Sequence, residues 1–453
     1  MKNYDLIVIG SGCGMNIVNE ALEHDLEVAL VDRGPLGGTC PNVGCIPSKM
    51  LIHSADRIVE ALQAKRVGVT ARIENVDFGF IMKRMREFVS ENKSQMRRGL
   101  TRTDGLDFYE GEGRFTEDYT IEVNGEKLKG AKIVIASGSR PVIPPIKGLE
   151  SVAYLTNETL LELRERPDSI VIIGGGYIAV EYGHFLAAMG TKVTILEMAD
   201  RLVFAEEPEV SHALQEELET RMEVHTDTQV DEVRRTDAGI AVLAKDGKTA
   251  EQREYVAQRI LMAVGRRSNA DILGVANTGV EVDNRGWIKV NAYLETNRKN
   301  IWAVGDANGT QMFTHVSNRE AMLVADAIVH GGRHKMDYSA APHAVYSFPQ
   351  IASVGLTEEN AKKAHKVLVG RASYFDTAKG EAMMEKEGFA KAVVEDETGK
   401  ILGFHIIGPY APMLIQEVVD AMAGGGDIGL VGRGMHIHPS MSELIPRALA
   451  DVG

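Results

Sequence analysis

The N-terminal stretch Tyr4-Asp-Leu-Ile-Val-Ile-Gly10-Ser-Gly12-Cys-Gly14 decides the fold of this chain. An apolar strand that runs into a glycine turn and then into a helix places backbone amides and a helix N-terminus against a pyrophosphate. The next strand ends at Asp32, about 20 residues further on, where a carboxylate can bind ribose hydroxyls. The stretch therefore predicts a dinucleotide-binding βαβ unit.

One position departs from the G-x-G-x-x-G pattern, because Met15 stands where the third glycine is expected. Close packing of the helix on the strand needs another small residue, and Gly14 is the candidate. Taken alone, the glycine turn is also compatible with a purely structural role. The acid at the expected distance favours dinucleotide binding.

A second copy of the pattern runs from Ser169 to Glu181 and contains Gly174, Gly176 and Ala179 at G-x-G-x-x-A spacing. Its second strand ends at Glu197. A carboxylate there accepts hydrogen bonds from ribose hydroxyls and repels a 2′-phosphate, which favours NADH over NADPH. Arg201 follows closely and leaves some tolerance of NADPH open. Two such sites, with the cysteine pair Cys40 and Cys45 after the first, predict a tightly held flavin at the first site and a diffusing nicotinamide at the second.

A third strand, Asn300-Ile-Trp-Ala-Val-Gly305-Asp306, ends in an acid that could receive the hydroxyls of a sugar-like chain. The alternative is that Asp306 caps the helix expected to run toward Ala327.

Two cysteines lie just after the first fingerprint, in the run Gly37-Gly-Thr-Cys-Pro-Asn-Val-Gly-Cys-Ile-Pro-Ser-Lys49. A zinc site would need four ligands, and Cys13 is the only other sulfur from cysteine, so we expect no metal. A structural staple is typical of small secreted domains, whereas this chain has 453 residues and begins directly with a strand. The pair Cys40 and Cys45 is therefore interpreted as redox-active.

The spacing of apolar residues predicts a helix from residue 46 to residue 62, with Pro47 in its first turn. Cys45 then lies at a helix N-terminus, and Lys49 follows one turn later. Both features stabilise a thiolate, which is the form that exchanges disulfides.

Composition narrows the class of protein further. The net charge of −14 argues against a nucleic-acid partner, and no apolar run approaches the roughly 18 residues that cross a bilayer. The small number of cysteines fits a reducing compartment. We therefore expect a soluble, cytoplasmic enzyme with no membrane association.

Several motifs together resemble those of the flavoprotein disulfide reductases. This family includes dihydrolipoamide dehydrogenase, glutathione reductase, mycothione reductase and mercuric reductase. The resemblance covers essentially the whole chain. Besides the cysteine run, it rests on Ala136-Ser-Gly-Ser-Arg-Pro141, Ala263-Val-Gly-Arg-Arg-Ser-Asn269, Gly305-Asp306 and His436-Ile-His-Pro-Ser-Met-Ser-Glu443.

The resemblance implies a role for each catalytic residue. Cys45 would lie nearest the flavin and Cys40 would exchange with substrate, while His438 would move the proton and Glu443 would orient its ring. An ion pair between two residues beside the flavin, Lys49 and Glu181, is also implied. His436 is expected to be structural.

The resemblance also implies the cofactor-binding residues. Those for FAD are Gly10, Gly12, Gly14, Asp32, Thr39, Lys49, Ser137, Gly138 and Asp306, and those for NAD are Gly174, Gly176, Ala179, Glu197 and Gly265.

The expected fold class is α/β, with two Rossmann-like dinucleotide-binding domains, for FAD and NAD, and a C-terminal α+β dimerisation domain. The expected boundaries are 1–147 for the FAD domain with the redox disulfide, 148–265 for the NAD domain, 266–338 for a central segment completing the FAD site, and 339–453 for the interface domain. A homodimer is implied, because in this family the histidine comes from the second subunit.

Among the family's reactions, the sequence favours oxidation of protein-bound dihydrolipoamide by NAD+, with a separate lipoylated carrier as partner. Mercuric and large thioredoxin reductases need a further C-terminal redox pair, which this chain lacks. A reductase of low-molecular-weight disulfides, of the mycothione or glutathione type and using NAD(P)H, stays open as an alternative. Two alternatives of other functional classes also stay open. One is an NADH oxidase or diaphorase, and the other is a redox-sensing interaction protein.

Overall fold

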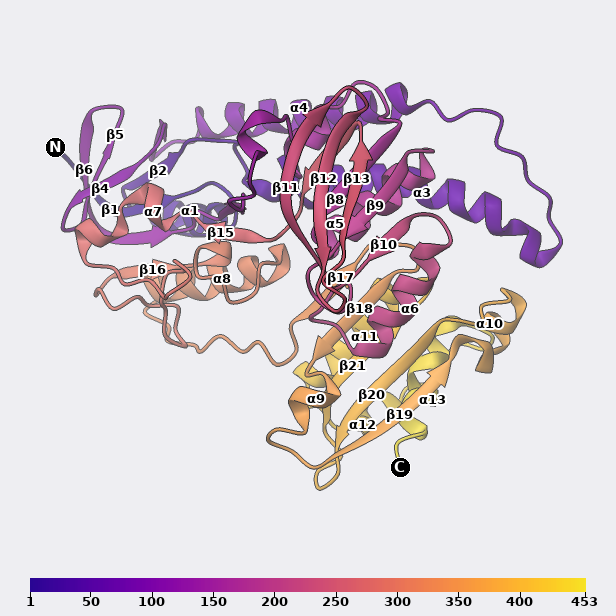
Figure 1. The fold of residues 1–453 in the computed structure, drawn as a ribbon. Coiled ribbons are helices and arrows are strands. Elements are labelled where there is room, and N and C mark those ends of the chain that lie inside the picture. Colours follow the sequence, from indigo (N-terminus) through magenta and orange to yellow (C-terminus); the bar gives the residue numbers. More distant parts are fainter. The chain divides into compact units, whose positions relative to one another are not determined.

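The computed structural model describes residues 1–453, and the chain divides into two compact units. The first unit comprises Met1–Ser48, Met82–Val142 and Gly265–Met336, and the second comprises Lys49–Ile81, Ile143–Val264 and Asp337–Gly453. Each unit thus brings together segments that are far apart in sequence, as the colours of Figure 1 show. The four-part domain division remains a prediction. No helix combines the length and apolarity needed to cross a membrane.

The first unit is built on a seven-stranded sheet in which β3, β2, β1, β6, β5 and β4 are neighbours in that order and β16 also pairs with β6. The pairs that β1 makes with β2 and β6, and that β16 makes with β6, are parallel. Residues Leu6 to Val8 are fully buried, as expected for a strand covered on both faces. The strands are β1 (Lys2–Ile9), β2 (Val28–Asp32), β3 (Leu106–Glu110), β4 (Arg114–Glu117), β5 (Thr120–Val123), β6 (Glu126–Ile135) and β16 (Ile301–Ala303).

Helices α1 (Gly14–Glu23) and α8 (Thr314–Val329) pack against each other beside this sheet (Figure 1). Their apolar residues Ile17, Val18 and Val324 belong to one buried cluster with strand residues of the sheet. Strands β7 (Ser139–Pro141) and β15 (Arg266–Ser268) pair where the chain leaves and re-enters this unit. The remaining helices of this part are α2 (Thr39–Val43), α4 (Phe78–Leu100), which begins in the second unit, and α7 (Ala270–Leu273).

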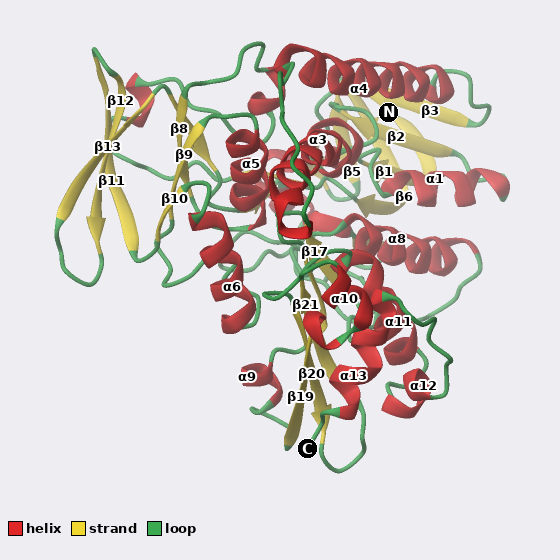
Figure 2. Ribbon diagram, turned by 90° about the vertical axis from the view of Figure 1, so that its right-hand side faces the viewer, coloured by secondary structure: helices red, strands yellow, loops and turns green.

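The second unit repeats the strand-turn-helix pattern in a four-stranded parallel sheet of order β10, β9, β8 and β14. A three-stranded antiparallel sheet of β11, β12 and β13 follows it (Figure 2). The elements are β8 (Ser169–Ile173), α5 (Tyr177–Ala188), β9 (Lys192–Leu196), α6 (Pro208–Glu219), β10 (Glu223–His225), β11 (Thr228–Thr236), β12 (Gly239–Asp246), β13 (Gln252–Ala257) and β14 (Arg259–Met262).

The C-terminal part of the second unit is a five-stranded antiparallel sheet of order β17, β18, β21, β20 and β19, with helices packed on it (Figure 2). Phe404 and Ile406 of the sheet share a buried core with Val418 and Leu444 of the helices. The elements are β17 (Pro342–Val345), β18 (Ile351–Gly355), α9 (Glu358–Ala361), β19 (Val367–Ser373), α10 (Ala378–Ala382), β20 (Phe389–Glu395), β21 (Ile401–Ile407), α11 (Ala411–Ala423), α12 (Ile428–Gly432) and α13 (Leu444–Ala450). The predicted α/β fold class is thus confirmed.

Helix α3 (Cys45–Gln63) agrees with the helix predicted after the second cysteine. Its residue Asp56 accepts a hydrogen bond from Nε2 of His184 at 3.0 Å, and Arg221 donates to Nδ1 of the same ring at 2.9 Å. Because arginine can only donate, the ring is neutral with its proton on Nε2. Burial lowers the pKa of His184, whose ring ties α3 to α5.

We expect His184→Gln to reduce the free energy of unfolding by about 1–3 kcal/mol at neutral pH, because Asp56 and Arg221 lose a buried partner. The wild-type ring stays neutral when folded but gains a proton when unfolded below about pH 6.5. The unfolded wild type then binds more protons, so the wild type loses stability on acidification and its advantage over the variant shrinks.

Urea unfolding of both proteins at pH 7.5 and 5.5, followed by circular dichroism, measures this difference. The control is His212→Gln, which replaces an exposed histidine. Its difference from wild type in unfolding free energy should show no effect of burial between the two pH values. An unchanged gap between wild type and His184→Gln would contradict the assignment.

Candidate active site and cofactor-binding loops

The two motif cysteines lie in the first unit, near the starts of two consecutive helices. Cys40 is the second residue of α2, and Cys45 is the exposed first residue of α3. Both are free thiols, and a hydrogen bond to the Cys45 sulfur, followed by burial, raises the pKa of Cys40. The thiol of Cys40 therefore stays protonated at neutral pH. Thr314 is the first residue of α8, and its hydroxyl oxygen lies 3.6 Å from the Cys45 sulfur. The sequence did not predict Thr314 as a residue of this site.

The third cysteine is unsuited to exchange. Cys13 lies at the N-cap of α1, and burial raises the pKa of its thiol to about 12. A buried, protonated thiol is a poor nucleophile.

Two glycines of the first fingerprint, Gly10 and Gly14, are packed too closely against their neighbours to carry a side chain. Gly10 has φ +105°, and a Cβ there would lie 2.2 Å from the carbonyl oxygen of Ala136. A Cβ on Gly14 would lie 2.8 Å from Cγ1 of Val8. Gly14 therefore provides the close helix-strand packing that Met15 cannot.

The fingerprint also touches the cysteine motif directly. A Cβ on Gly38, whose φ is +77°, would lie 2.9 Å from Cα of Gly12. Two glycines thus allow the backbone before Thr39 and Cys40 to approach the turn before α1. Local spacing in the sequence does not reveal this contact.

The acids that end the second strands of both fingerprints bind loop amides. Asp32 accepts from the amides of Ser11 and Gly34, both at 2.5 Å. Glu197 likewise accepts from the amide of Gly175, and from that of Ala199 at 2.6 Å. Each carboxylate therefore fixes its glycine turn.

The residues around the first fingerprint fit a bound FAD. The hydroxyl of Ser137 is buried without a hydrogen-bond partner, and the amides at the N-terminus of α1 have no side-chain cap. Gly138 follows with φ +66° and open space at its Cβ position. An orphaned donor and uncapped amides are what a polar ligand satisfies.

Asp306 lies in a short 3-10 turn, Gly305–Ala307, and α8 begins only at Thr314, so Asp306 does not cap that helix. The Ser139 hydroxyl donates to the Asp306 carboxylate at 2.6 Å, and Nε of Arg266 donates to Ser139 at 2.7 Å. The buried carboxylate of Glu320 also holds this turn. It accepts a hydrogen bond from the amide of Gly305 at 2.6 Å and one from the side chain of Asn308 at 3.0 Å. Sequence reasoning missed Arg266 and Glu320.

The second fingerprint repeats the geometry of the first. Gly174 has φ +109°, and its Cβ position lies 2.4 Å from the carbonyl oxygen of Ala263. Gly176 is the N-cap of α5 with open space around it, and Ala179 is fully buried. Gly265, with φ +119°, begins the return to the first unit.

The guanidinium of Arg201 is bound by neighbouring residues of its own loop. Its guanidinium lies 3.2 Å from Asp200, donates to the carbonyl of Phe204 and stacks 4.1 Å from the Phe204 ring centroid. Those contacts compete with a 2′-phosphate for the arginine.

The structure brings Lys49 and Glu181 together in the second unit. The lysine Nζ lies 3.0 and 2.7 Å from the two carboxylate oxygens, and Glu181 is buried. The amide of Tyr346 donates to the same carboxylate at 2.9 Å, and the lysine lies 4.7 Å from the Tyr346 ring centroid. Tyr346 is a further residue that the sequence did not single out for this pair.

The two C-terminal histidines each pair with a glutamate. Nδ1 of His438 lies 3.0 Å from Glu443, and the hydrogen bond from this ring lowers the pKa of that carboxyl. The amide of Ser440 binds the other oxygen of Glu443 at 3.1 Å. His438 is 70% exposed, whereas His436 is 13% exposed and lies 2.6 Å from Glu417. Only His438 is therefore open to an incoming group.

Two nucleotide-type fingerprints and an exchange-competent cysteine pair define a pyridine nucleotide-linked flavoprotein with a dithiol centre. The comparisons agree, since the profile described as "Pyridine nucleotide-disulphide oxidoreductase" matches residues 4–329 and its dimerisation domain matches residues 341–449. The chain belongs to this family, the class I flavoprotein disulfide reductases, which bind FAD and NAD(P)H.

Relatives with different substrates are about equally similar. The dihydrolipoyl dehydrogenase of Bacillus subtilis is 33% identical, covering 98% of this chain and 97% of its own. The mycothione reductase of Mycobacterium tuberculosis is 32% identical, covering 99% of both. A solved structure titled as a Cu(II) complex of the HOCl-induced flavoprotein disulfide reductase RclA from Escherichia coli has a TM-score of 0.88 and 27% identity, covering 99% of both chains.

We expect Gly38→Ala to weaken FAD binding at least about tenfold, which corresponds to about 1.4 kcal/mol. The added Cβ would displace Gly12 and with it the turn that faces the cofactor. Gly68→Ala is the matched control, because Gly68 has a similar φ of +80° but nothing within 4 Å of its Cβ position. The flavin-to-protein ratio after dialysis measures the effect, and full retention of FAD by Gly38→Ala would contradict it.

Proposed function

We propose that the chain oxidises protein-bound dihydrolipoamide with NAD+ as acceptor, through a redox disulfide between Cys40 and Cys45. The observation that carries this proposal is the hydrogen-bonded pair of Cys40 in α2 and Cys45 at the start of α3, beside the first fingerprint. The relative named dihydrolipoyl dehydrogenase supports the choice of substrate. The enzyme is proposed to act in the cytoplasm, as a homodimer.

The thiol chemistry follows from the different environments of the two sulfurs. In the oxidised enzyme, a substrate thiolate attacks the Cys40 sulfur, the disulfide breaks, and Cys45 leaves as the thiolate. The second substrate thiolate then attacks the first substrate sulfur, which closes the substrate disulfide and frees Cys40 as a thiolate. The N-terminus of α3 stabilises the charge on Cys45. Bound FAD supplies the chemistry that moves the electron pair from the reduced cysteines to the nicotinamide.

Substrate thiols must lose protons before they attack, so a base is needed. His438 is proposed to accept that proton, while Glu443 holds the ring through Nδ1 and stays ionised, because the ring's hydrogen bond lowers its pKa. The exposure of His438 supports its use by a second subunit, as does the match to the dimerisation profile. Each active site would then need residues of two chains.

Lys49, held by the buried Glu181, is proposed to place a fixed cation beside the flavin. The proposed NAD preference rests on Glu197, whose charge opposes a 2′-phosphate, and on Arg201, whose two terminal nitrogens are already engaged.

A second candidate is reduction of a low-molecular-weight disulfide by NAD(P)H, which the similarity to mycothione reductase favours. It would use the same sulfurs in the opposite direction. Steady-state rates with dihydrolipoamide and NAD+, compared with mycothione disulfide and NADPH, separate the two. Turnover confined to the second pair of substrates would overturn the proposed function.

We expect Cys40→Ser to abolish dihydrolipoamide oxidation, because no disulfide can form. NADH-dependent reduction of an artificial dye should persist, since the dye accepts electrons without thiol exchange. Both rates can be measured on the same FAD-loaded preparation. Retained lipoamide turnover would contradict the exchange role, and wild-type turnover only with oxygen or quinone would favour an oxidase.

We expect His438→Gln to lower kcat for dihydrolipoamide by about 10²–10⁴, the usual contribution of a positioned base, with little change in dye reduction. His436→Gln is the matched control, because it also removes a histidine paired with a glutamate, Glu417, in the same C-terminal region. Equal losses in both variants would indicate a structural effect and count against the proton-transfer role.

A further inference from the structure

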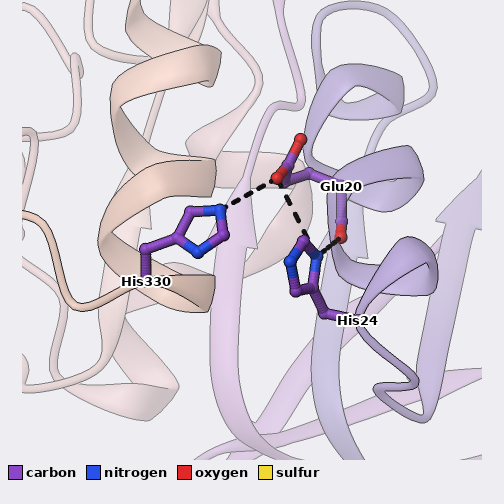
Figure 3. Close-up of side chains that lie close together, drawn as sticks. All are labelled: Glu20, His24 and His330. Carbon is purple, nitrogen blue, oxygen red and sulfur yellow. Dashed lines mark hydrogen bonds and ion pairs between the residues drawn. The ribbon is translucent and has the colours of Figure 1, made fainter.

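Two histidines and a glutamate meet at the C-terminal ends of α1 and α8, within the first unit (Figure 3). Glu20 is in the last turn of α1, His24 is the C-cap residue of α1, and His330 is the C-cap residue of α8. One ligand atom from each residue lies within 4.8 Å of the other two. None of the three takes part in the proposed dithiol chemistry.

The carboxylate lies between the two rings. Oε1 of Glu20 is 3.1 Å from Nε2 of His330 and 3.9 Å from Nδ1 of His24. The two imidazole rings are nearly perpendicular, with centroids 4.7 Å apart. The side chains are 37%, 42% and 48% exposed for Glu20, His24 and His330, so water can complete a coordination sphere.

The donor set selects a class of ion. Two imidazole nitrogens and one carboxylate suit Zn²⁺, Cu²⁺ and similar transition metals, whereas Mg²⁺ and Ca²⁺ prefer oxygen ligands alone. The place in the fold favours a cation as well. Two helices end there, and the last carbonyls of each helix carry partial negative charge.

We propose that Glu20, His24 and His330 bind one divalent transition-metal ion, with water as the remaining ligand, and that the ion links the ends of α1 and α8. Ligand atoms about 2.0–2.1 Å from zinc in a tetrahedron lie about 3.4 Å from one another, so the rings must move inward slightly. Their exposure allows that rotation. An ion that binds only the folded arrangement raises its stability.

The test uses the FAD-loaded protein carrying Cys40→Ser and Cys45→Ser, so that the active-site thiols do not bind the probe. Calorimetric titration with Zn²⁺ should show one equivalent. His24→Ala and His330→Ala in this background should each weaken that equivalent at least tenfold, and Glu20→Gln should weaken it less. His212→Ala is the matched control, because His212 and Glu216 form an exposed pair at the same four-residue spacing, 3.2 Å apart. Unchanged zinc affinity in His24→Ala and His330→Ala would overturn the proposal.

Two further measurements separate coordination from a structural role of the histidines. The zinc-induced rise in Tm should be present in His212→Ala and absent in His330→Ala, whatever the Tm of each metal-free protein. With Cu²⁺ as probe, electron paramagnetic resonance should show two coordinated nitrogens in the control and one in either ligand variant. A spectrum and a Tm rise that are the same in all variants would overturn the site. Because Cys40 and Cys45 are replaced, these outcomes are independent of the proposed function.

Discussion

The close approach of two backbone segments, at Gly12 and Gly38, is the constraint on which the rest of the candidate site depends. It places the segment that carries Cys40 and Cys45 directly on the turn of the first fingerprint. Gly38 cannot carry a side chain without moving Gly12, so the redox motif and the nucleotide turn are fixed together. This packing positions the cysteine pair beside the nucleotide turn. The helix that starts at Cys45 makes the pair reactive, because its N-terminus stabilises a thiolate.

A second principle appears in both halves of the internal repeat. In each fingerprint the first glycine lies against a carbonyl of the neighbouring strand, and an acid from the next strand accepts amides of the turn. Each carboxylate also accepts an amide two residues further along its own loop, so it is a preorganised acceptor for ribose hydroxyls as well. Asp32 and Glu197 are therefore structural residues and candidate ligand-binding residues at once.

The ionisable pairs of the chain show why a residue pattern does not identify a role. His438 with Glu443, His436 with Glu417 and His212 with Glu216 are all histidine-glutamate pairs. They differ in exposure and in what surrounds them, which only the folded chain sets. A buried pair fixes structure, an exposed one can meet a proton donor, and a third ligand nearby changes the chemistry again, as at Glu20, His24 and His330.

The sequence by itself determined the α/β class, the two fingerprints, the helix after Cys45 and the redox pair, because each is set by spacing within about 30 residues and by local strand, turn and helix preferences. Only the tertiary structure decided that Thr314 meets Cys45, that Glu320 holds the Asp306 turn and that Ser137 has an unsatisfied hydroxyl. The physical reason is that Thr314 and Cys45 lie far apart in the chain, and that the roles of Glu320 and Ser137 depend on their burial. Neither long-range contact nor burial is encoded in a local pattern.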